Sequence, residues 1–309
     1  MPGAREDGAG WTDANGNLWL FGGSGFDSTG ALGPLDDLWK FNPSNSQWAW
    51  MGGSNTAVCN TSGQTNCVTA VFGTLGAQAT GNFPGLRTSQ AIWTASDGNI
   101  WLFGGQGYDS LGNPGILNDL WRFNPSTGLW TWMGGSATLP NPAGSPGIYG
   151  TLGASAPGNM PGSRVSATTW TDANGNLWLY GGYGVDSAGQ TGYLDDLWEF
   201  TPATGLWEWV GGANAIPLLP IQTWNSPQYA TAGVYGTIYT PAPQNHPGGR
   251  VGGIGWTDAN GNLWLYSGSG GDVYGLLGVL SDIWEFSTTT QEWAWMGGPL
   301  PSSFCPPMG

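Results

Sequence analysis

The apolar residues of this chain occur in short runs separated by glycine, proline and asparagine, and the same order of runs occurs four times. In the first copy, LWLFGG from Leu18 is apolar on both faces and is followed by LDDLWKF from Leu35 and WAWMGG from Trp48. Runs this short, without a 3.6-residue period, predict strands rather than helices. A run that lacks a polar face predicts a strand in the middle of a covered sheet.

The four copies define the expected organisation of the chain. Each begins at P-G-x-R and ends at the glycines after W-x-W, which gives units at about 2–53, 84–135, 161–212 and 247–298 and a tail at 299–309. D-x-x-G-N and N-P-S-T-G-like sequences suit the hairpins that would join four strands in each unit. Tandem four-stranded antiparallel units predict an all-β β-propeller, here a single domain of four blades with long connectors.

Three elements of each unit resemble kelch repeats: the glycine pair that closes the second strand, L-[DNS]-D-[LI]-W-x-F, and W-x-W. The connector sequences VFGTLG at Val71, IYGTLG at Ile148 and VYGTIY at Val234 resemble those of a subgroup found in many bacterial secreted proteins. This resemblance covers nearly the whole chain and implies a kelch-like propeller. The fourth copy departs from it at Ser267, which replaces the first glycine of the pair.

The units begin and end in phase, so no strand from one terminus completes a blade at the other. Three arrangements remain open on the sequence. The blades could close as a four-bladed ring in one chain, form an eight-bladed ring from two chains, or continue as an open array into a neighbouring molecule. We favour the first arrangement.

Tryptophan and charge follow the repeat. Twenty of the 21 tryptophans fall at five fixed positions of the four copies, which predicts that they pack between neighbouring blades. Each copy also has one arginine in P-G-x-R and one aspartate in L-x-D, and this stoichiometry predicts one buried ion pair in each unit. The residues are Arg5, Arg87, Arg164 and Arg250 with Asp37, Asp119, Asp196 and Asp282.

Composition excludes several classes of partner. The net charge is −14 with six basic residues, so no basic patch for nucleic acid or for an anionic membrane surface is expected. No apolar run approaches the roughly 18 residues of a membrane span. We expect no enzyme: the motifs H-E-x-x-H, C-x-x-C and G-x-S-x-G do not occur, and the carboxylate pairs recur with the repeat. Some kelch-like propellers are copper oxidases that resemble galactose oxidase and need two histidines, and the single histidine, His246, excludes that function here.

One loop suggests a ligand. The glycine-rich sequence ahead of L-x-D has an aspartate in each copy, and oxygen-rich loops of this kind suit Ca²⁺. The alternative is an aspartate that accepts hydrogen bonds from its own loop. These aspartates are Asp27, Asp109, Asp186 and Asp272.

The connectors are the expected recognition surface, because long loops on a rigid scaffold often bind ligands. The third connector is the longest, and its aromatic residues Trp224, Tyr229, Tyr235 and Tyr239 are the candidate ligand-binding residues. We expect a binding or adhesion module for a protein or glycan ligand. The alternative is a structural subunit that associates with copies of itself.

Cysteine usage favours an extracellular or cell-surface location. Cys59 and Cys67 lie eight positions apart in the first connector, and a disulfide between them is expected. Cys305 is left over. The chain starts MPGAR without a signal peptide, as expected for a trimmed or mature form or for a cytoplasmic protein.

Overall fold

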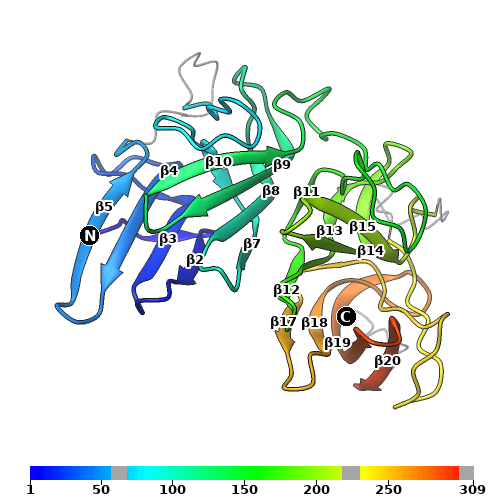
Figure 1. The fold of residues 1–309 in the computed structure, drawn as a ribbon. Helices are drawn as coiled ribbons and strands as arrows, with labels where there is room; N and C mark the ends of the chain where they lie inside the picture. The colour runs from blue at the N-terminus through cyan, green and yellow to red at the C-terminus, as the bar shows by residue number, and fades with distance from the viewer. Residues whose placement is uncertain (57–67, 218–229, 299–309) are drawn as a thin grey trace, which may run out of the picture. The chain divides into compact units, whose positions relative to one another are not determined.

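The repeat forms four antiparallel β-sheets, one for each copy (Figure 1). The computed structural model describes residues 1–56, 68–217 and 230–298, and its regular elements within these ranges are all strands. This confirms the prediction of an all-β chain with four sheet units, which we call blades 1 to 4 in chain order. No helix in the described part of the chain is long and apolar enough to cross a membrane.

Blades 1 and 2 have the same strand order. The first two strands are short, and both pair with the same edge of the long third strand. The fourth and fifth strands follow on the other side of the third. Blade 1 consists of β1 (Arg5–Glu6), β2 (Ala9–Thr12), β3 (Leu18–Phe26), β4 (Leu32–Asn42) and β5 (Gln47–Gly52). Blade 2 consists of β6 (Arg87–Thr88), β7 (Ala91–Thr94), β8 (Ile100–Tyr108), β9 (Pro114–Asn124) and β10 (Leu129–Gly134).

Blades 3 and 4 repeat this pattern, and the last strand of every blade is the edge opposite the two short strands. Blade 3 consists of β11 (Arg164–Val165), β12 (Thr168–Thr171), β13 (Leu177–Val185), β14 (Thr191–Thr201) and β15 (Leu206–Gly211). Blade 4 consists of β16 (Arg250–Val251), β17 (Ile254–Thr257), β18 (Leu263–Gly271), β19 (Leu277–Ser287) and β20 (Glu292–Gly297).

The first strand of each blade is interrupted, whereas the sequence predicts a continuous strand such as 164–171. Asp7, Ser89 and Ser166 have positive φ values of 54°, 56° and 54° at the interruption. A non-glycine residue in this region bends the backbone away from the extended path. The predicted first strand is therefore two short strands that pair with one neighbour.

The chain forms two compact units. The first contains the described residues of 1–145 and 162–166, and the second contains those of 146–161 and 167–298. Blades 1 and 2 lie in the first unit; blades 3 and 4 lie in the second, except that β11 belongs with the first. The single domain and the three arrangements of blades stay predictions.

Aromatic side chains fill the space between the two blades of each unit. In the first unit, the ring centroid of Trp19 in blade 1 lies 5.2 Å from that of Phe123 in blade 2, and those of Phe21 and Trp130 lie 5.3 Å apart. All distances between aromatic residues below are between ring centroids. In the second unit, the equivalent pairs Trp178–Phe286 and Tyr180–Trp293 lie at 5.5 and 5.6 Å. We call the surface that contains Trp19 and Phe21 the front face of a blade, and the one that contains Phe123 and Trp130 the back face.

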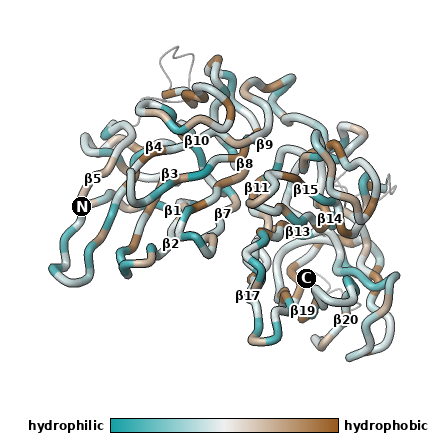
Figure 2. The backbone as a smooth tube through the Cα atoms, viewed as in Figure 1, coloured by the Kyte–Doolittle hydropathy of each residue, from teal (hydrophilic) through white to brown (hydrophobic). Residues whose placement is uncertain are grey.

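Hydropathy follows the same division. Hydrophobic residues concentrate along the strands, and the hairpin between β4 and β5 is hydrophilic (Figure 2). The seven largest fully buried side chains are tryptophans. The prediction that tryptophans form the core between blades agrees with these contacts within each unit.

Buried ion pairs join the P-G-x-R arginine to the L-x-D aspartate in three of the blades. The guanidinium groups of Arg5, Arg87 and Arg250 donate to Asp37, Asp119 and Asp282, each with one bond of 2.8 Å. Arg164 and Asp196 are buried, with 1% and 0% of their surface exposed. Although burial disfavours a charged carboxylate, the bonds from Arg250 hold the pKa of Asp282 below its ordinary value.

Candidate functional site: an aromatic socket on each blade

Every blade has a socket on its back face, built from three residues of its last two strands. The L-x-D aspartate forms the base, and the tryptophan two residues later donates its indole N–H to Oδ2 of that aspartate. This bond is 2.6 Å long at Trp39 and 2.7 Å at Trp121, Trp198 and Trp284. The second tryptophan of W-x-W forms the other wall; it is Trp50, Trp132, Trp209 or Trp295.

In blades 2 to 4, an aromatic residue of the preceding connector fills this socket. Phe72 lies 5.1 Å from both Trp121 and Trp132. Tyr149 lies 4.8 Å from Trp198 and 5.2 Å from Trp209.

In blade 4 the occupant is Tyr235, 4.8 Å from Trp284 and 5.6 Å from Trp295. The rings of all three occupants are tilted or perpendicular to the indoles, which is a favourable geometry for aromatic pairs.

The two tyrosines also make a polar contact at the base of their sockets. The hydroxyl of Tyr149 donates to Asp196 Oδ2 and that of Tyr235 donates to Asp282 Oδ2, both at 2.7 Å. Burial and the nearby Asp282 charge raise the pKa of Tyr235, so the phenol stays protonated and can donate. Phe72 fills its socket without this bond.

The connector continues along the edge strand of the same blade. Four residues after the aromatic position, the backbone N–H donates to the carbonyl of the second tryptophan. The three bonds are Gly76 to Trp132 at 2.8 Å, Gly153 to Trp209 at 2.9 Å and Tyr239 to Trp295 at 2.8 Å. Each connector therefore inserts a side chain and also pairs with the exposed edge of the blade.

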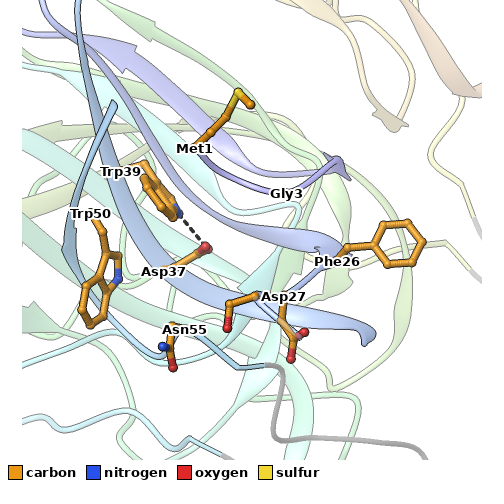
Figure 3. A pocket seen from close by; sticks show the side chains of 9 residues that line it. Met1, Gly3, Phe26, Asp27, Asp37, Trp39, Trp50 and Asn55 are labelled. Carbon is orange, nitrogen blue, oxygen red and sulfur yellow. Dashed lines mark hydrogen bonds between the residues drawn. The ribbon is translucent and has the colours of Figure 1, made fainter. Parts of the chain in front are cut away.

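The socket of blade 1 is an open pocket of about 340 Å³. Asp37, Trp39 and Trp50 line it as they do in the other blades, and Asp27, Asn55 and Met1 line the rest. Figure 3 shows the two indoles of this pocket, the Trp39–Asp37 hydrogen bond, and the polar groups of Asp27 and Asn55. The pocket is large enough for a small ligand or one side chain of a partner.

The walls of this pocket differ from those of the filled sockets. Trp50 is 51% exposed, whereas its equivalents in blades 2 to 4 are half-buried. The indoles of Trp132, Trp209 and Trp295 donate to the carbonyl two residues later at 2.6 to 2.8 Å. Within the described residues, Trp50 has no such bond. The open socket therefore leaves its second wall exposed.

Comparison with known proteins places the fold. The solved structure of YjhT superimposes with a TM-score of 0.51 and 15% sequence identity, over 96% of this chain and 71% of that one. The fold is that of a β-propeller. No protein-family model matches the propeller sequence. The relation to the bacterial secreted kelch subgroup stays a prediction.

Short segments of this propeller are similar to curated relatives named N-acetylneuraminate epimerase. The protein of Escherichia coli strain K12 is 42% identical over 48 residues, which is 16% of this chain and 13% of the relative. That of Haemophilus influenzae strain PittEE is 35% identical over 74 residues, or 24% and 18%. The propeller thus aligns with less than a fifth of the length of these relatives.

These relatives correct one expectation from the sequence. The absence of familiar catalytic motifs led to the prediction that the propeller is not an enzyme, and this prediction is wrong, because the proteins that it resembles are named as an enzyme. The motifs sought were those of other folds, and this is why they misled. An active site can be assembled from single residues of several blades, and no short motif records it.

The predicted ligand-binding residues of the third connector lie in different settings. Tyr235 is buried in the socket of blade 4, so its ring and hydroxyl contact the blade itself. Tyr239 is 66% exposed, and its backbone pairs with the edge strand. Trp224 and Tyr229 lie outside the described residues, as do Cys59, Cys67 and Cys305. Ligand binding by the third connector stays a prediction.

The aspartates of the candidate Ca²⁺ loops accept hydrogen bonds from their own loops. Asp186 Oδ1 accepts from the amides of Ala188 and Gln190, both at 2.8 Å, and Oδ2 accepts from Ile216 at 2.7 Å. Asp27, Asp109 and Asp272 accept equivalent bonds in their loops. Among the described residues, no three His, Cys, Asp or Glu side chains cluster as a metal site.

A buried aspartate of blade 3, Asp195, lies beside the single histidine of the chain. His246 Nδ1 lies 3.3 Å from Asp195 Oδ2, beside the buried Asp196. Burial and the Asp196 charge raise the pKa of Asp195 to about 7, and burial lowers the pKa of His246. Asp195 Oδ1 accepts a hydrogen bond from the backbone N–H of Ala213, and the equivalent residue in blade 2, Asn118, accepts the same bond from the backbone N–H of Ser136.

The open socket was not predicted from the sequence, although a signal for it exists. The socket elements L-x-D and W-x-W occur four times, whereas the aromatic-Gly-Thr sequence that fills a socket occurs three times. Counting both elements would have assigned one socket without an occupant. The contact between them spans 47 residues, as in Tyr149–Asp196, and no local pattern indicates it.

Proposed function

We propose that this propeller is a binding module that captures a polypeptide segment of a partner protein in the blade 1 socket. One observation carries the proposal: three sockets of the same construction are filled by polypeptide, and none of the residues that the structure describes fills the fourth. Recognition would combine a side-chain pocket with backbone pairing at a sheet edge, a common mode of peptide binding.

The edge of blade 1 supports the backbone part of this proposal. In blades 2 to 4, the carbonyls of both W-x-W tryptophans accept hydrogen bonds from the connector, for example Trp209 from Gly153 and Trp207 from Asn159. The equivalent carbonyls in β5 belong to Trp48 and Trp50, on strand residues that are half-buried and exposed. A bound segment can pair with these carbonyls. The expected location outside the cell or at its surface belongs to this proposal as well.

Selection of peptides on the full-length propeller tests the proposal. Peptides selected from a random displayed library should have an aromatic residue and should lose binding to Trp50→Ala. Tyr274→Ala is the matched control, because Tyr274 is 64% exposed in a loop of blade 4 and should leave binding unchanged. Selected peptides that bind wild type and Trp50→Ala equally would disprove binding in this socket.

A sugar is the second candidate ligand, because the relatives are named for N-acetylneuraminate. Trp50 offers an exposed aromatic face, and Asp27 and Asn55 offer hydrogen-bonding groups beside it. Proton NMR of N-acetylneuraminate with the propeller would test both binding and interconversion of epimers. Unchanged spectra would remove this sugar as a ligand and as a substrate.

A further inference from the structure

The segments that fill the sockets share a sequence as well as a position. Phe72, Tyr149 and Tyr235 are each followed by Gly-Thr, and ten residues later by asparagine, at Asn82, Asn159 and Asn245. The flanking residues pair with each other, as Ile148 does with Met160 at 2.8 and 2.9 Å, and close the segment into a loop. We call this loop the connector loop.

The asparagine joins the connector loop to the blade. Asn159 Nδ2 donates to Ala154 O within the loop at 3.0 Å and to Trp207 O of the edge strand at 3.2 Å. Asn82 and Asn245 make the same two bonds in blades 2 and 4. The aromatic residue and the asparagine thus attach the loop to the blade at two points.

Blade 1 keeps the acceptors for both points. Asp37 Oδ2 accepts from Trp39 and Arg5, as Asp282 Oδ2 accepts from Trp284 and Arg250. In blade 4 the same oxygen also accepts from Tyr235. Asp37 Oδ2 thus has two of the three donors that Asp282 Oδ2 has. The third would be the hydroxyl of an aromatic ring that fits between Trp39 and Trp50.

We infer that the segment bound in the blade 1 socket is itself a connector loop, with Tyr-Gly-Thr and an asparagine ten residues later. This inference rests on the proposed function and names its partner. Its tyrosine would donate to Asp37 Oδ2, and its asparagine would donate to the carbonyl of Trp48.

The partner differs from the fourth blade of a second copy of this chain. Where one blade follows another, a glycine allows close approach: a Cβ on Gly22 would lie 2.7 Å from Arg87 O, and one on Gly181 would lie 2.9 Å from Arg250 O. Blade 4 has Ser267 at this position, with a φ of 64° and a side chain that donates to Leu280 O. Its Cβ would collide with the arginine carbonyl of a following blade.

A synthetic peptide of residues 147–160, GIYGTLGASAPGNM, is the probe. Added to the full-length propeller, it should bind saturably and change the tryptophan fluorescence. Replacing the peptide tyrosine with phenylalanine should weaken binding about tenfold, because a hydrogen bond to a carboxylate is lost. Replacement with alanine should abolish it. Trp50→Ala should bind no peptide, whereas Tyr274→Ala should bind as wild type does.

A covalent version removes the dependence on the affinity of a linear peptide. Each connector loop runs directly into P-G-x-R, as Met160 does into Pro161, and Met1 precedes Pro2 in the same way. Residues 146–160 attached ahead of Pro2 should therefore reach the blade 1 socket. The melting temperature should rise by about 2 to 6 °C, and the same extension with alanine in place of tyrosine should give no rise.

The outcomes separate this inference from the proposed function. If the peptide and the extension both fail while selected peptides bind in a Trp50-dependent manner, the connector loop is not the partner, and the proposed function stands. If the selected peptides fail as well, both are overturned. Self-association of the wild type that Trp50→Ala abolishes would also overturn the inference, because a second copy would then occupy the socket.

Discussion

Blades 1 and 4 have the same socket residues but bury them to different extents. In blade 4, Trp284 and Trp293 are 0% and 5% exposed, and Tyr235 lies against the socket walls. In blade 1, the equivalent Trp39 and Trp48 are only half-buried. The last two strands of blade 1 are nearly identical in sequence to those of blade 4, so the repeat alone does not determine this burial. The connector loop, which places Tyr235 against Trp284, and the preceding blade, which places Tyr180 against Trp293, together determine whether the outer tryptophans are buried.

The largest effect is expected from opening the filled socket. Tyr235→Ala removes a buried ring and its bond to Asp282, and should lower the free energy of unfolding by about 3 to 4 kcal/mol. Urea unfolding followed by tryptophan fluorescence measures the change. Tyr239→Ala, at an exposed position of the same connector, should change it by less than about 0.5 kcal/mol. Equal effects of the two variants would contradict the role assigned to the socket.

The next effect concerns the buried carboxylate of blade 3. The pKa of Asp195 is raised to about 7, so the folded chain holds this proton at pH values where the unfolded chain, with an ordinary pKa near 3.8, has released it. Stability from this group is therefore present below about pH 4 and lost as pH rises towards 7. Asp195→Asn, which places in blade 3 the residue that blade 2 has at Asn118, should raise the free energy of unfolding at pH 8 by about 2 kcal/mol and by much less at pH 4. A gain that is the same at both pH values would disagree with this account.

A smaller effect should follow from exchanging the occupants of the sockets. Tyr149→Phe removes the hydroxyl bond to Asp196 but keeps the ring, and should cost about 1 kcal/mol in thermal or urea unfolding. Phe72→Tyr, the reciprocal change in blade 2, should add a hydroxyl that donates to Asp119. It should raise the free energy of unfolding by part of that amount. If Phe72→Tyr destabilises the protein as much as Tyr149→Phe does, the sockets are not equivalent.

The smallest effect is expected at the open socket. Trp50→Ala should change the free energy of unfolding by no more than about 0.5 kcal/mol, because half of the side chain is exposed to solvent. Trp295→Ala removes the equivalent wall of a filled socket and should cost several times more. Both are measured by urea unfolding, and a loss as large at Trp50 as at Trp295 would show that the first socket is filled in solution.

Much of the fold was predictable because each sequence pattern occurs in all four copies of the repeat. The strands, the inter-blade tryptophans and the arginine–aspartate stoichiometry all follow from spacing that recurs with each unit. The break within the first strand did not follow, because the serine of positive φ at position 166 is not a residue type that indicates such a turn. Its conformation depends on contacts made after folding.

The candidate site was predictable only in part. The aspartate loops suit either a cation or their own amides, and the same carboxylates serve both, so the pattern around Asp186 could not separate these alternatives. Tyr235 is a candidate on the sequence because of its aromatic ring, although that ring lies inside the blade. The pairing of connector and blade is a long-range contact, which no local pattern indicates. The enzyme prediction rested on short motifs, and a site assembled from separate residues need not contain one.

The order of socket and connector loop also bears on how the chain is made. The described connector loop of residues 148–160 precedes in sequence the blade that it completes, and it belongs to the same compact unit as that blade. Since a ribosome releases the N-terminal side first, each such loop emerges before the strands that receive it. In blades 2 to 4, the connector loop can thus bind in its socket as soon as the last strand of the blade leaves the exit tunnel. No later segment is needed. The propeller is therefore suited to stepwise, vectorial folding during synthesis.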